Sequence, residues 1–216
     1  MKVLVVDIGG SSAKIKLQGR EPLKFRTGKK LTPERFIWEL KLLTDGWNYD
    51  RVSIGFPGVV KHNRVLIEPE NLGPGWVGFD FAKALKKRTR VMNDAAMQAL
   101  GSAHKAGISL FLGLGTGLGV ALVVEGHVVP TELGEAHVEL VNKKARKRDG
   151  PKRWIAAVKS AIDDFDRNLH PDEIVIGGGG VKQLQPFRKH FPHRAIREGD
   201  NDRAFLGGLR MWSRSA

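Results

Sequence analysis

Apolar residues occur along this chain in short continuous runs separated by segments of helical periodicity. Six apolar runs predict buried strands at residues 3–6, 15–17, 52–56, 110–114, 120–124 and 174–176. Apolar residues recur at helical spacing over 36–43, 95–103, 154–165 and 205–212, which predicts four helices. The alternation of hairpins and helices predicts an α/β fold.

Residues at the ends of these segments refine the prediction. Thr32 and Pro33 supply an N-cap and a first-turn proline for the first helix, and Gly46 ends it. Hairpin, helix and strand recur in each half of the chain, which indicates an internal duplication. The charged residues 142–153 lack periodicity, and we expect them to form an exposed loop.

Two glycine-rich turns follow apolar runs and lead into others, so each is expected at the tip of a β-hairpin. Their candidate phosphate-binding residues are Asp7, Gly9, Gly10, Ser11 and Lys14 in the first turn, and Gly115, Thr116 and Gly117 in the second. Without a Cβ, such turns let backbone N–H groups approach phosphate oxygens. The second turn matches neither a Walker A loop nor a Rossmann turn, and a purely structural hairpin is the alternative for it. An acid in one turn and a hydroxyl in the other favour a clamp around a phosphate chain.

Two carboxylates stand at predicted strand ends. Asp7 either caps a turn or holds Mg²⁺, directly or through water, beside the phosphates, and the glycines that follow favour the metal. Asp94 opens the helix that continues at Ala95, so it is either a cap or a base that accepts the proton of a substrate hydroxyl.

Two further segments are candidates for ligand contacts. The strand at 174–176 runs into Gly178 and Gly179 and then a predicted helix start, where a phosphate or nucleotide can rest, or where strand and helix simply join tightly. Residues 131–139 include Glu132, Glu135 and His137, which suit sugar hydroxyls. A solvated loop and a metal site are the alternatives for that segment, although a lone histidine is a poor zinc site.

The amino-acid composition limits the classes of binding partner and the cellular location that we expect. Among 216 residues, 36 Lys and Arg against 23 Asp and Glu give a net charge of +13, which predicts a polyanionic partner or merely a basic surface. The absence of cysteine excludes disulfides and thiolate zinc sites and fits a reducing, cytoplasmic location. The apolar run at 3–6 is too short for a signal peptide or a membrane span, so no membrane partner is expected.

The order of these motifs resembles that of the sugar kinases of the ROK (repressor, ORF, kinase) family, in particular the polyphosphate glucokinase branch. The matching segments are residues 7–14, 53–60, 71–76, 93–94, 113–119, 132–134 and 177–180. The resemblance implies a two-lobed, actin-like ATPase (ribonuclease H-like) fold with a central cleft. Residues 1–94 and 204–216 would form the small lobe and residues 95–203 the large lobe.

The same resemblance implies a kinase that moves a phosphoryl group from polyphosphate or ATP to the 6-hydroxyl of glucose or a similar hexose. Asp94 would be the general base and Asp7 would act on Mg²⁺. Sugar contacts would come from Asn71, Asn93, Glu132 and either Glu135 or His137. The two turns would hold the donor phosphates, with Gly178 and Gly179 on the adenosine side.

Three departures from the family pattern stand out. Glu135 occupies the position where the family usually has histidine, and His137 follows two residues later. The cysteine-rich zinc motif is absent, as in the polyphosphate branch, and the chain is short for the family.

The net charge favours polyphosphate as donor, with ATP as a second donor. Residues 143–153 and the cluster Lys182, Arg188, Lys189, Arg194 and Arg197 are candidate cationic tracks. One rival hypothesis is a non-catalytic sugar- or nucleotide-binding homologue. The other is a basic nucleic-acid-binding protein, but the chain shows no recognition module and no aromatic ladder, so DNA is not expected. A homodimer is compatible with the sequence.

Overall fold

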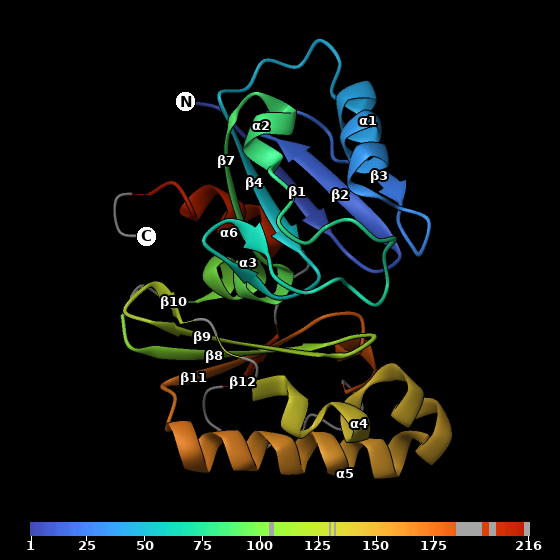
Figure 1. The fold of residues 1–216 in the computed structure, drawn as a ribbon. Helices are drawn as coiled ribbons and strands as arrows, with labels where there is room; N and C mark the ends of the chain where they lie inside the picture. The colour runs from blue at the N-terminus through green and yellow to red at the C-terminus, as the bar shows by residue number, and fades with distance from the viewer. Residues whose placement is uncertain (104–105, 130, 132, 185–195, 199–201, 214–216) are drawn as a thin grey trace. The chain divides into compact units, whose positions relative to one another are not determined.

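The structure, a computed structural model, describes residues 1–103, 106–129, 131, 133–184, 196–198 and 202–213. The chain divides into two compact units, the first formed by Met1–Met97 with Ala204–Arg214 and the second by Gln98–Arg203 with Ser215–Ala216. Each unit contains a five-stranded sheet with helices packed against it (Figure 1).

The sheet of the first unit has the strand order β3-β2-β1-β4-β7. Strands β1, β2 and β3 are antiparallel neighbours, whereas β1, β4 and β7 run parallel. The elements are β1 (Val3–Ile8), β2 (Ser12–Leu17), β3 (Leu23–Arg26), α1 (Pro33–Leu43), β4 (Arg51–Phe56), β5 (Val60–Lys61), β6 (Arg64–Val65), α2 (Phe81–Leu85), β7 (Arg88–Asn93), the start of α3 (Asp94–Ser102), and α6 (Arg203–Arg210).

Helices cover both faces of this sheet. Successive residues of β1 point to opposite faces, so apolar side chains of this strand are available for packing on both. Leu4 and Val6 belong to a core that also contains Phe36 of α1 and Phe81 of α2. Trp76, which is fully buried, packs among the aromatic rings of this core, with its ring centroid 5.8 Å from that of Phe36.

The opposite face of the sheet receives α6, so the end of the chain returns to the first unit. A Cβ added to Gly208 would lie 2.3 Å from Cγ1 of Val5, which shows how closely α6 approaches β1. The hydroxyl of Ser53 donates to the carbonyl oxygen of Gly208 over 2.6 Å, and Nε1 of Trp212 donates to Oγ of Ser53 over 2.8 Å. These contacts tie α6 and the residues after it to the centre of the sheet.

The second sheet has the strand order β10-β9-β8-β11-β12, which repeats the pattern of the first sheet. Here too three strands form an antiparallel meander and two more follow in parallel. The predicted duplication is therefore present as topology. The elements are β8 (Ile108–Leu114), β9 (Leu118–Val124), β10 (His127–Val129), the 3₁₀ helix η1 (Leu133–Ala136), α4 (Val138–Val141), α5 (Lys143–Leu169), β11 (Glu173–Gly177), the 3₁₀ helix η2 (Val181–Gln183) and β12 (Ile196–Glu198).

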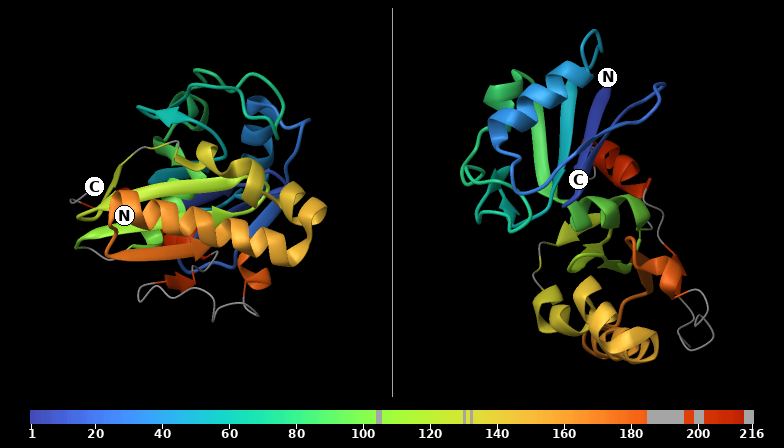
Figure 2. Two further views of the ribbon diagram at one scale, coloured as in Figure 1. Left: turned by 90° about the horizontal axis from the view of Figure 1, so that it is seen from below. Right: turned by 90° about the vertical axis from the view of Figure 1, so that its right-hand side faces the viewer.

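The long helix α5 runs across one face of the second sheet (Figures 1 and 2). Its buried residues Trp154, Val158 and Ile162 belong to one core with Leu110 and Leu112 of β8. The periodic apolar stripe identified in the sequence is thus the face that α5 buries.

The six predicted strands and four predicted helices are confirmed, and so is the α/β class. The loop expected at 142–153 is wrong, because α5 begins at Lys143. Oδ1 of Asn142 caps the helix by accepting from the backbone N–H of Ala145 over 2.7 Å. In this stretch only the polar Asn142 and the small Ala145 are buried, and at Gly150 the helix is kinked by a non-helical backbone with φ 75° and ψ 169°. The apolar periodicity that would reveal a helix is therefore missing.

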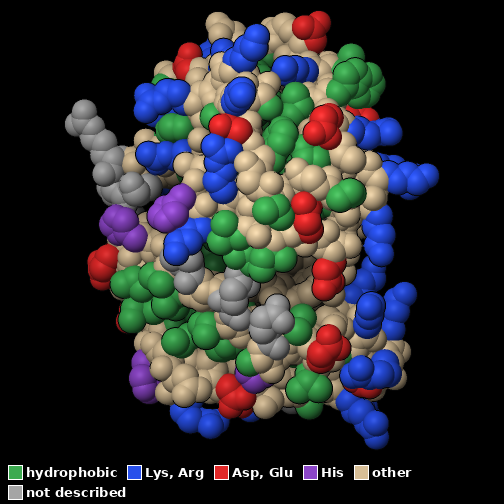
Figure 3. All heavy atoms as spheres, in the orientation of Figure 1, with side chains coloured by type: hydrophobic (Ala, Val, Ile, Leu, Met, Phe, Trp, Pro, Cys, Tyr) green, Lys and Arg blue, Asp and Glu red, His purple; other side chains and the backbone are tan. Residues whose placement is uncertain are grey.

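The exposed charges of this first part of α5 form a basic surface. Lys143, Lys144, Lys147 and Arg148 are exposed, and Figure 3 shows Lys and Arg side chains gathered at the lower right, where this end of α5 lies. Among the described helices, none combines the length and the apolar character required to cross a bilayer.

Candidate functional site

Two acidic residues stand at the ends of parallel strands in the first unit. In the sheet register Asp7 is paired with Gly55, and Gly55 with Met92, two residues before Asp94. Since β1 and β7 are the two neighbours of β4, and neighbouring strands lie about 4.8 Å apart, Asp7 and Asp94 flank Gly55 from its two sides. A Cβ at Gly55 would lie 2.4 Å from Cε of Met97 and 3.4 Å from Cα of Asp94, so a glycine is needed between them.

The surroundings of this pair disfavour its negative charge. The pKa of Asp94 is raised to about 7, mainly by burial and next by the charge of Asp7, while the backbone N–H of Ala95, 2.8 Å from Oδ1, acts in the opposite direction. Burial also raises the pKa of Asp7 to about 6, against the lowering effect of Lys14, its cross-strand partner. A carboxyl group with a pKa near neutrality is suited to accept and release a proton at physiological pH.

The first glycine-rich turn is closed by Thr27. The backbone N–H of Gly9 donates to the carbonyl oxygen of Ser12 over 3.0 Å. Oγ1 of Thr27 donates to the carbonyl oxygen of Gly9 over 2.6 Å. The backbone N–H of Thr27 donates to the carbonyl oxygen of Ser11 over 3.2 Å. A Cβ at Gly10 would lie 3.4 Å from Cβ of Asn71, so the exposed Asn71 lies beside this turn.

The side chain of Asn93 is engaged at both ends. Oδ1 accepts from the backbone N–H of Ala96 over 3.1 Å, and Nδ2 donates to the carbonyl oxygen of Gly58 over 3.1 Å. Asn93 thereby caps α3 and ties its start to the Phe56–Gly58 turn, which fixes the backbone of Asp94.

One carboxylate of the first unit was missed in the sequence. Glu68 accepts hydrogen bonds from the backbone N–H groups of Gly75, Trp76 and Val77 over 3.0 to 3.2 Å. Desolvation acts to raise the pKa of Glu68, but these three donors outweigh it and the pKa lies below its usual value. Glu68 therefore closes the loop that carries Asn71, and the sequence gives no signal for it because all three of these donors are backbone N–H groups.

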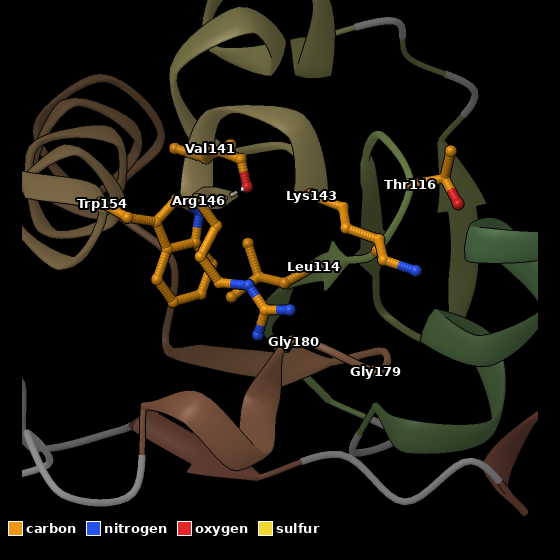
Figure 4. A pocket seen from close by; sticks show the side chains of 9 residues that line it. Leu114, Thr116, Val141, Lys143, Arg146, Trp154, Gly179 and Gly180 are labelled. Carbon is orange, nitrogen blue, oxygen red and sulfur yellow. Dashed lines mark hydrogen bonds between the residues drawn. The ribbon is translucent and has the colours of Figure 1, made fainter. Parts of the chain in front are cut away.

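In the second unit the other glycine-rich turn borders a cavity of about 320 Å³ (Figure 4). The turn joins β8 to β9, and its Gly115 carbonyl oxygen accepts from the backbone N–H of Lys143 over 3.1 Å. The cavity is lined by residues of that turn, of α4 and α5, and of the segment after β11, namely Leu114, Gly115, Thr116, Val141, Lys143, Arg146, Trp154, Gly179 and Gly180.

The glycines after β11 press the backbone against the end of β8. Gly178 has φ +84°, and a Cβ there would lie 2.5 Å from the carbonyl oxygen of Leu114. The backbone N–H of Gly180 donates to the same oxygen over 2.8 Å. A Cβ at Gly179, by contrast, would meet nothing within 4 Å, so this residue faces open space. The helix expected to start here is only the single 3₁₀ turn η2.

The segment predicted to contact sugar is only partly described. Glu132 lies outside the described residues, and the side chain of Glu135, in η1, is not described either. Nε2 of His137 lies 3.7 Å from Oδ2 of Asp164, and its ring packs edge-on against Phe165 at 5.1 Å between centroids. The imidazole is therefore placed against α5.

The structure thus gathers the predicted residues into two groups. Asp7, Gly9, Gly10, Ser11, Lys14, Asn71, Asn93 and Asp94 belong to the first unit, and Gly115, Thr116, Gly117, Gly178 and Gly179 to the second. Arg188, Lys189 and Arg194 of the second candidate cationic track lie outside the described residues. Within the described parts of the chain, no group of three His, Cys, Asp or Glu side chains is placed to hold a metal ion.

Comparisons with known proteins bear out the family resemblance found in the sequence. The sequence model of the ROK family matches residues 4–141. Polyphosphate glucokinase of Mycobacterium tuberculosis is 23% identical over 204 residues, covering 81% of this chain and 76% of that protein.

Two solved structures share the fold. The inorganic polyphosphate/ATP-glucomannokinase of Arthrobacter sp. strain KM superposes with a TM-score of 0.81 at 23% identity, covering 96% of both chains. A ROK family glucokinase of Streptomyces griseus, in complex with glucose and AMPPNP, superposes with a TM-score of 0.78 at 16% identity, covering 98% of this chain and 99% of that one. The predicted actin-like ATPase fold class is confirmed.

Proposed function

Since this chain belongs to the ROK family, we propose that it is a sugar kinase that transfers a phosphoryl group from polyphosphate, ATP or both to the 6-hydroxyl of glucose or a similar hexose. The observation that carries this proposal is the environment of Asp94, whose pKa is raised to about 7 at the end of β7, next to a second carboxylate. The names of its relatives, among them polyphosphate glucokinase and polyphosphate/ATP-glucomannokinase, give the reaction class.

The proposed step needs one base and neutralised phosphate charge. The hexose 6-hydroxyl oxygen forms a bond to the terminal phosphorus of the donor while its proton passes to the Asp94 carboxylate. The bond from that phosphorus to its bridging oxygen breaks, and the electron pair stays on the shortened donor. Asn93 contributes by fixing the start of α3 and hence the backbone of Asp94.

Asp7 fits the role of an Mg²⁺ ligand. Its carboxylate is partly buried, and among the described residues no hydrogen bond is donated to it, so a cation would relieve an unfavourable charge. Mg²⁺ in proteins is commonly held by one or two carboxylates together with waters and phosphate oxygens. Bound there, directly or through water, it would supply neutralisation of the donor phosphates.

For the sugar we propose Asn71, Asn93, Glu132, Glu135 and His137 as ligands. Asn71 is exposed beside the first turn, and Glu68 holds the loop that presents it. A sugar contact by His137 would require its imidazole to leave Phe165 and Asp164.

For the donor phosphates we propose the two turns and the glycines after β11. Gly9, Gly10, Ser11 and Lys14 would act from the first unit, and Gly115, Thr116, Gly117, Gly178 and Gly179 from the second. We accordingly propose residues 1–94 with 204–216 and residues 95–203 as the two functional lobes.

A panel of hexoses assayed with Mg²⁺ against ATP and polyphosphate in parallel tests the proposed function. Asp94→Asn should lower kcat by roughly 10²–10⁴, because the base is removed while the hydrogen-bond acceptor for Ala95 remains. Asp45→Asn, which alters an exposed carboxylate of the first unit, is the matched control and should leave kcat unchanged.

Two outcomes would contradict the proposed function. One is the absence of phosphorylation of every hexose with both donors, which would favour a binding protein without chemistry. The other is an Asp94→Asn variant as active as the wild type, which would reduce Asp94 to a helix cap.

A further inference from the structure

We propose that Lys143 and Arg146 of α5 bind the phosphate groups of a polyphosphate chain beyond the one transferred, and so set the preference of the enzyme for polyphosphate over ATP. This inference rests on the proposed function and adds the residues that select the donor.

The first observation is the position of the two cations. Lys143 and Arg146 are three residues apart at the start of α5, and both line the cavity that also contains Thr116 of the second turn. Figure 4 shows the guanidinium of Arg146 above Gly180 and the Lys143 side chain extending on the side of Thr116. A chain of phosphates held at the turn would therefore meet two further positive charges in the same cavity.

The second observation concerns the acidic partners of these two cations. Among the described residues, no carboxylate oxygen lies within salt-bridge distance of Lys143 or Arg146, whereas Arg148 on the same helix is paired with Asp149 at 2.7 Å. A cation that lines a cavity without an acidic partner favours an anionic ligand.

The third observation concerns Trp154, the aromatic residue of the cavity. Its Nε1 donates to the carbonyl oxygen of Val141 over 2.8 Å, its side chain is 2% exposed, and the guanidinium carbon of Arg146 lies 5.8 Å from the ring centroid. The ring is therefore used to orient Arg146 and does not offer a free face on which a nucleobase can stack. The cavity is better suited to phosphate oxygens than to adenine.

The backbone keeps this arrangement together. The N–H of Lys143 donates to the carbonyl oxygen of Gly115, so the start of α5 is attached to the turn itself. Gly179 faces open space at the cavity, which leaves room for a ligand beside the two cations.

The experiment compares two double variants that remove the same charge. Lys143→Ala/Arg146→Ala removes the cations of the cavity, and Lys41→Ala/Lys83→Ala removes two exposed cations of the first unit that do not line it. The first should raise the KM for polyphosphate about tenfold or more, because two charge-assisted contacts are lost, and should raise the KM for ATP much less. The second should change neither KM by more than about threefold.

Direct binding of a polyphosphate of defined length, measured by calorimetry without sugar, separates this inference from the proposed function. The affinity of the wild type should fall with salt, and the slope should be smaller by about two in the cavity variant, by analogy with phosphate contacts in nucleic acids. This readout holds whether or not any hexose is phosphorylated. Arg146→Lys, which keeps the charge but loses the planar fork, should give an intermediate loss and guards against a folding defect in the alanine variant.

Three results would overturn the inference. These are equal effects of the two double variants, a larger rise in the KM for ATP than for polyphosphate, and the absence of polyphosphate binding by the wild type even when the ATP-dependent kinase reaction is intact.

Discussion

At the scale of single residues, Asp94 combines a proposed chemical role with a cost in stability. Its folded pKa of about 7 lies above the ordinary 3.8, so the folded protein holds the Asp94 proton more tightly than the unfolded chain does. The contribution of this group to stability is therefore fully present below about pH 4. It is lost progressively as the pH rises through 7.

We expect Asp94→Asn to stabilise the protein at pH 8, on the order of 2 kcal/mol, because the amide keeps the acceptor for Ala95 without the charge. The gain should vanish near pH 4, where Asp94 is protonated in both states. Urea denaturation at the two pH values, in a chelator, measures this difference. Equal or lower stability of the variant at pH 8 would show that Asp94 carries no such cost.

Gly178 and Gly179 are adjacent, yet their substitution by alanine should differ. Gly178→Ala should cost about 2 kcal/mol or more, because φ is +84° and the new Cβ would lie 2.5 Å from the carbonyl oxygen of Leu114. Gly179→Ala should cost less than about 1 kcal/mol, since nothing lies within 4 Å of its Cβ position. Thermal unfolding of the pair tests this, and equal losses would contradict the assigned backbone geometry.

The sequence alone identified acidic residues that come after an apolar run. Asp7 and Asp94 each follow an apolar run, which is why they were found. Glu68 escaped notice because its partners are backbone N–H groups, which one residue's identity does not reveal. Trp154 was correctly placed on the buried stripe of its helix, but its contact with Arg146 depends on the kink at Gly150.

At the scale of elements, the start of α5 is decided by one cap. Asn142 accepts from the N–H of Ala145 over 2.7 Å and is 6% exposed. Asn142→Ala should therefore lower the free energy of unfolding by about 1 kcal/mol, whereas Asn142→Asp should retain most of it. Urea denaturation of the three proteins measures this. An alanine variant as stable as the wild type would mean that the first turn of α5 needs no side-chain cap.

The elements that the sequence did not predict are short or lie at sheet edges. β3 has four residues, half of them exposed, and β10 has three, so neither carries a continuous apolar run. The central strands β4 and β11 were found because almost every residue in them is buried. Pairing to an existing sheet, rather than local sequence, creates the edge strands.

At the scale of the whole molecule, the chain uses one five-stranded topology twice and then returns to its beginning. The sequence indicated the repetition through its two glycine-rich hairpins. Strand order in the two sheets depends on pairing between segments far apart in the sequence, which periodicity does not report. The two-lobed, actin-like fold class was therefore predicted from the resemblance of the motifs to those of sugar kinases, and not from periodicity.

A substitution of Trp212 tests whether α6 and the residues after it pack against the sheet of the first unit. The guanidinium carbons of Arg51 and Arg90 each lie 4.6 Å from the centroid of the Trp212 ring, and Nε1 of Trp212 donates to Oγ of Ser53. Trp212→Ala should destabilise the first unit by about 2–4 kcal/mol, since packing, cation–π contacts and a hydrogen bond are lost together. Hydrogen exchange of β1 and β4 amides, compared with those of β8 and β11, should show the loss mainly in the former. Equal loss in both sheets would argue against α6 belonging to the first unit.

The attachment of α6 to β1 and β4 has a consequence for how the protein is made on the ribosome. Translation delivers the strands of the first sheet early, but the helix that covers the second face of this sheet is made only after the strands and helices of the second unit. The contacts of Val5 and Ser53 with Gly208 can form only after more than a hundred further residues have been added to the chain. A nascent chain stalled before that point would carry an uncovered apolar sheet face, the kind of surface that chaperones bind.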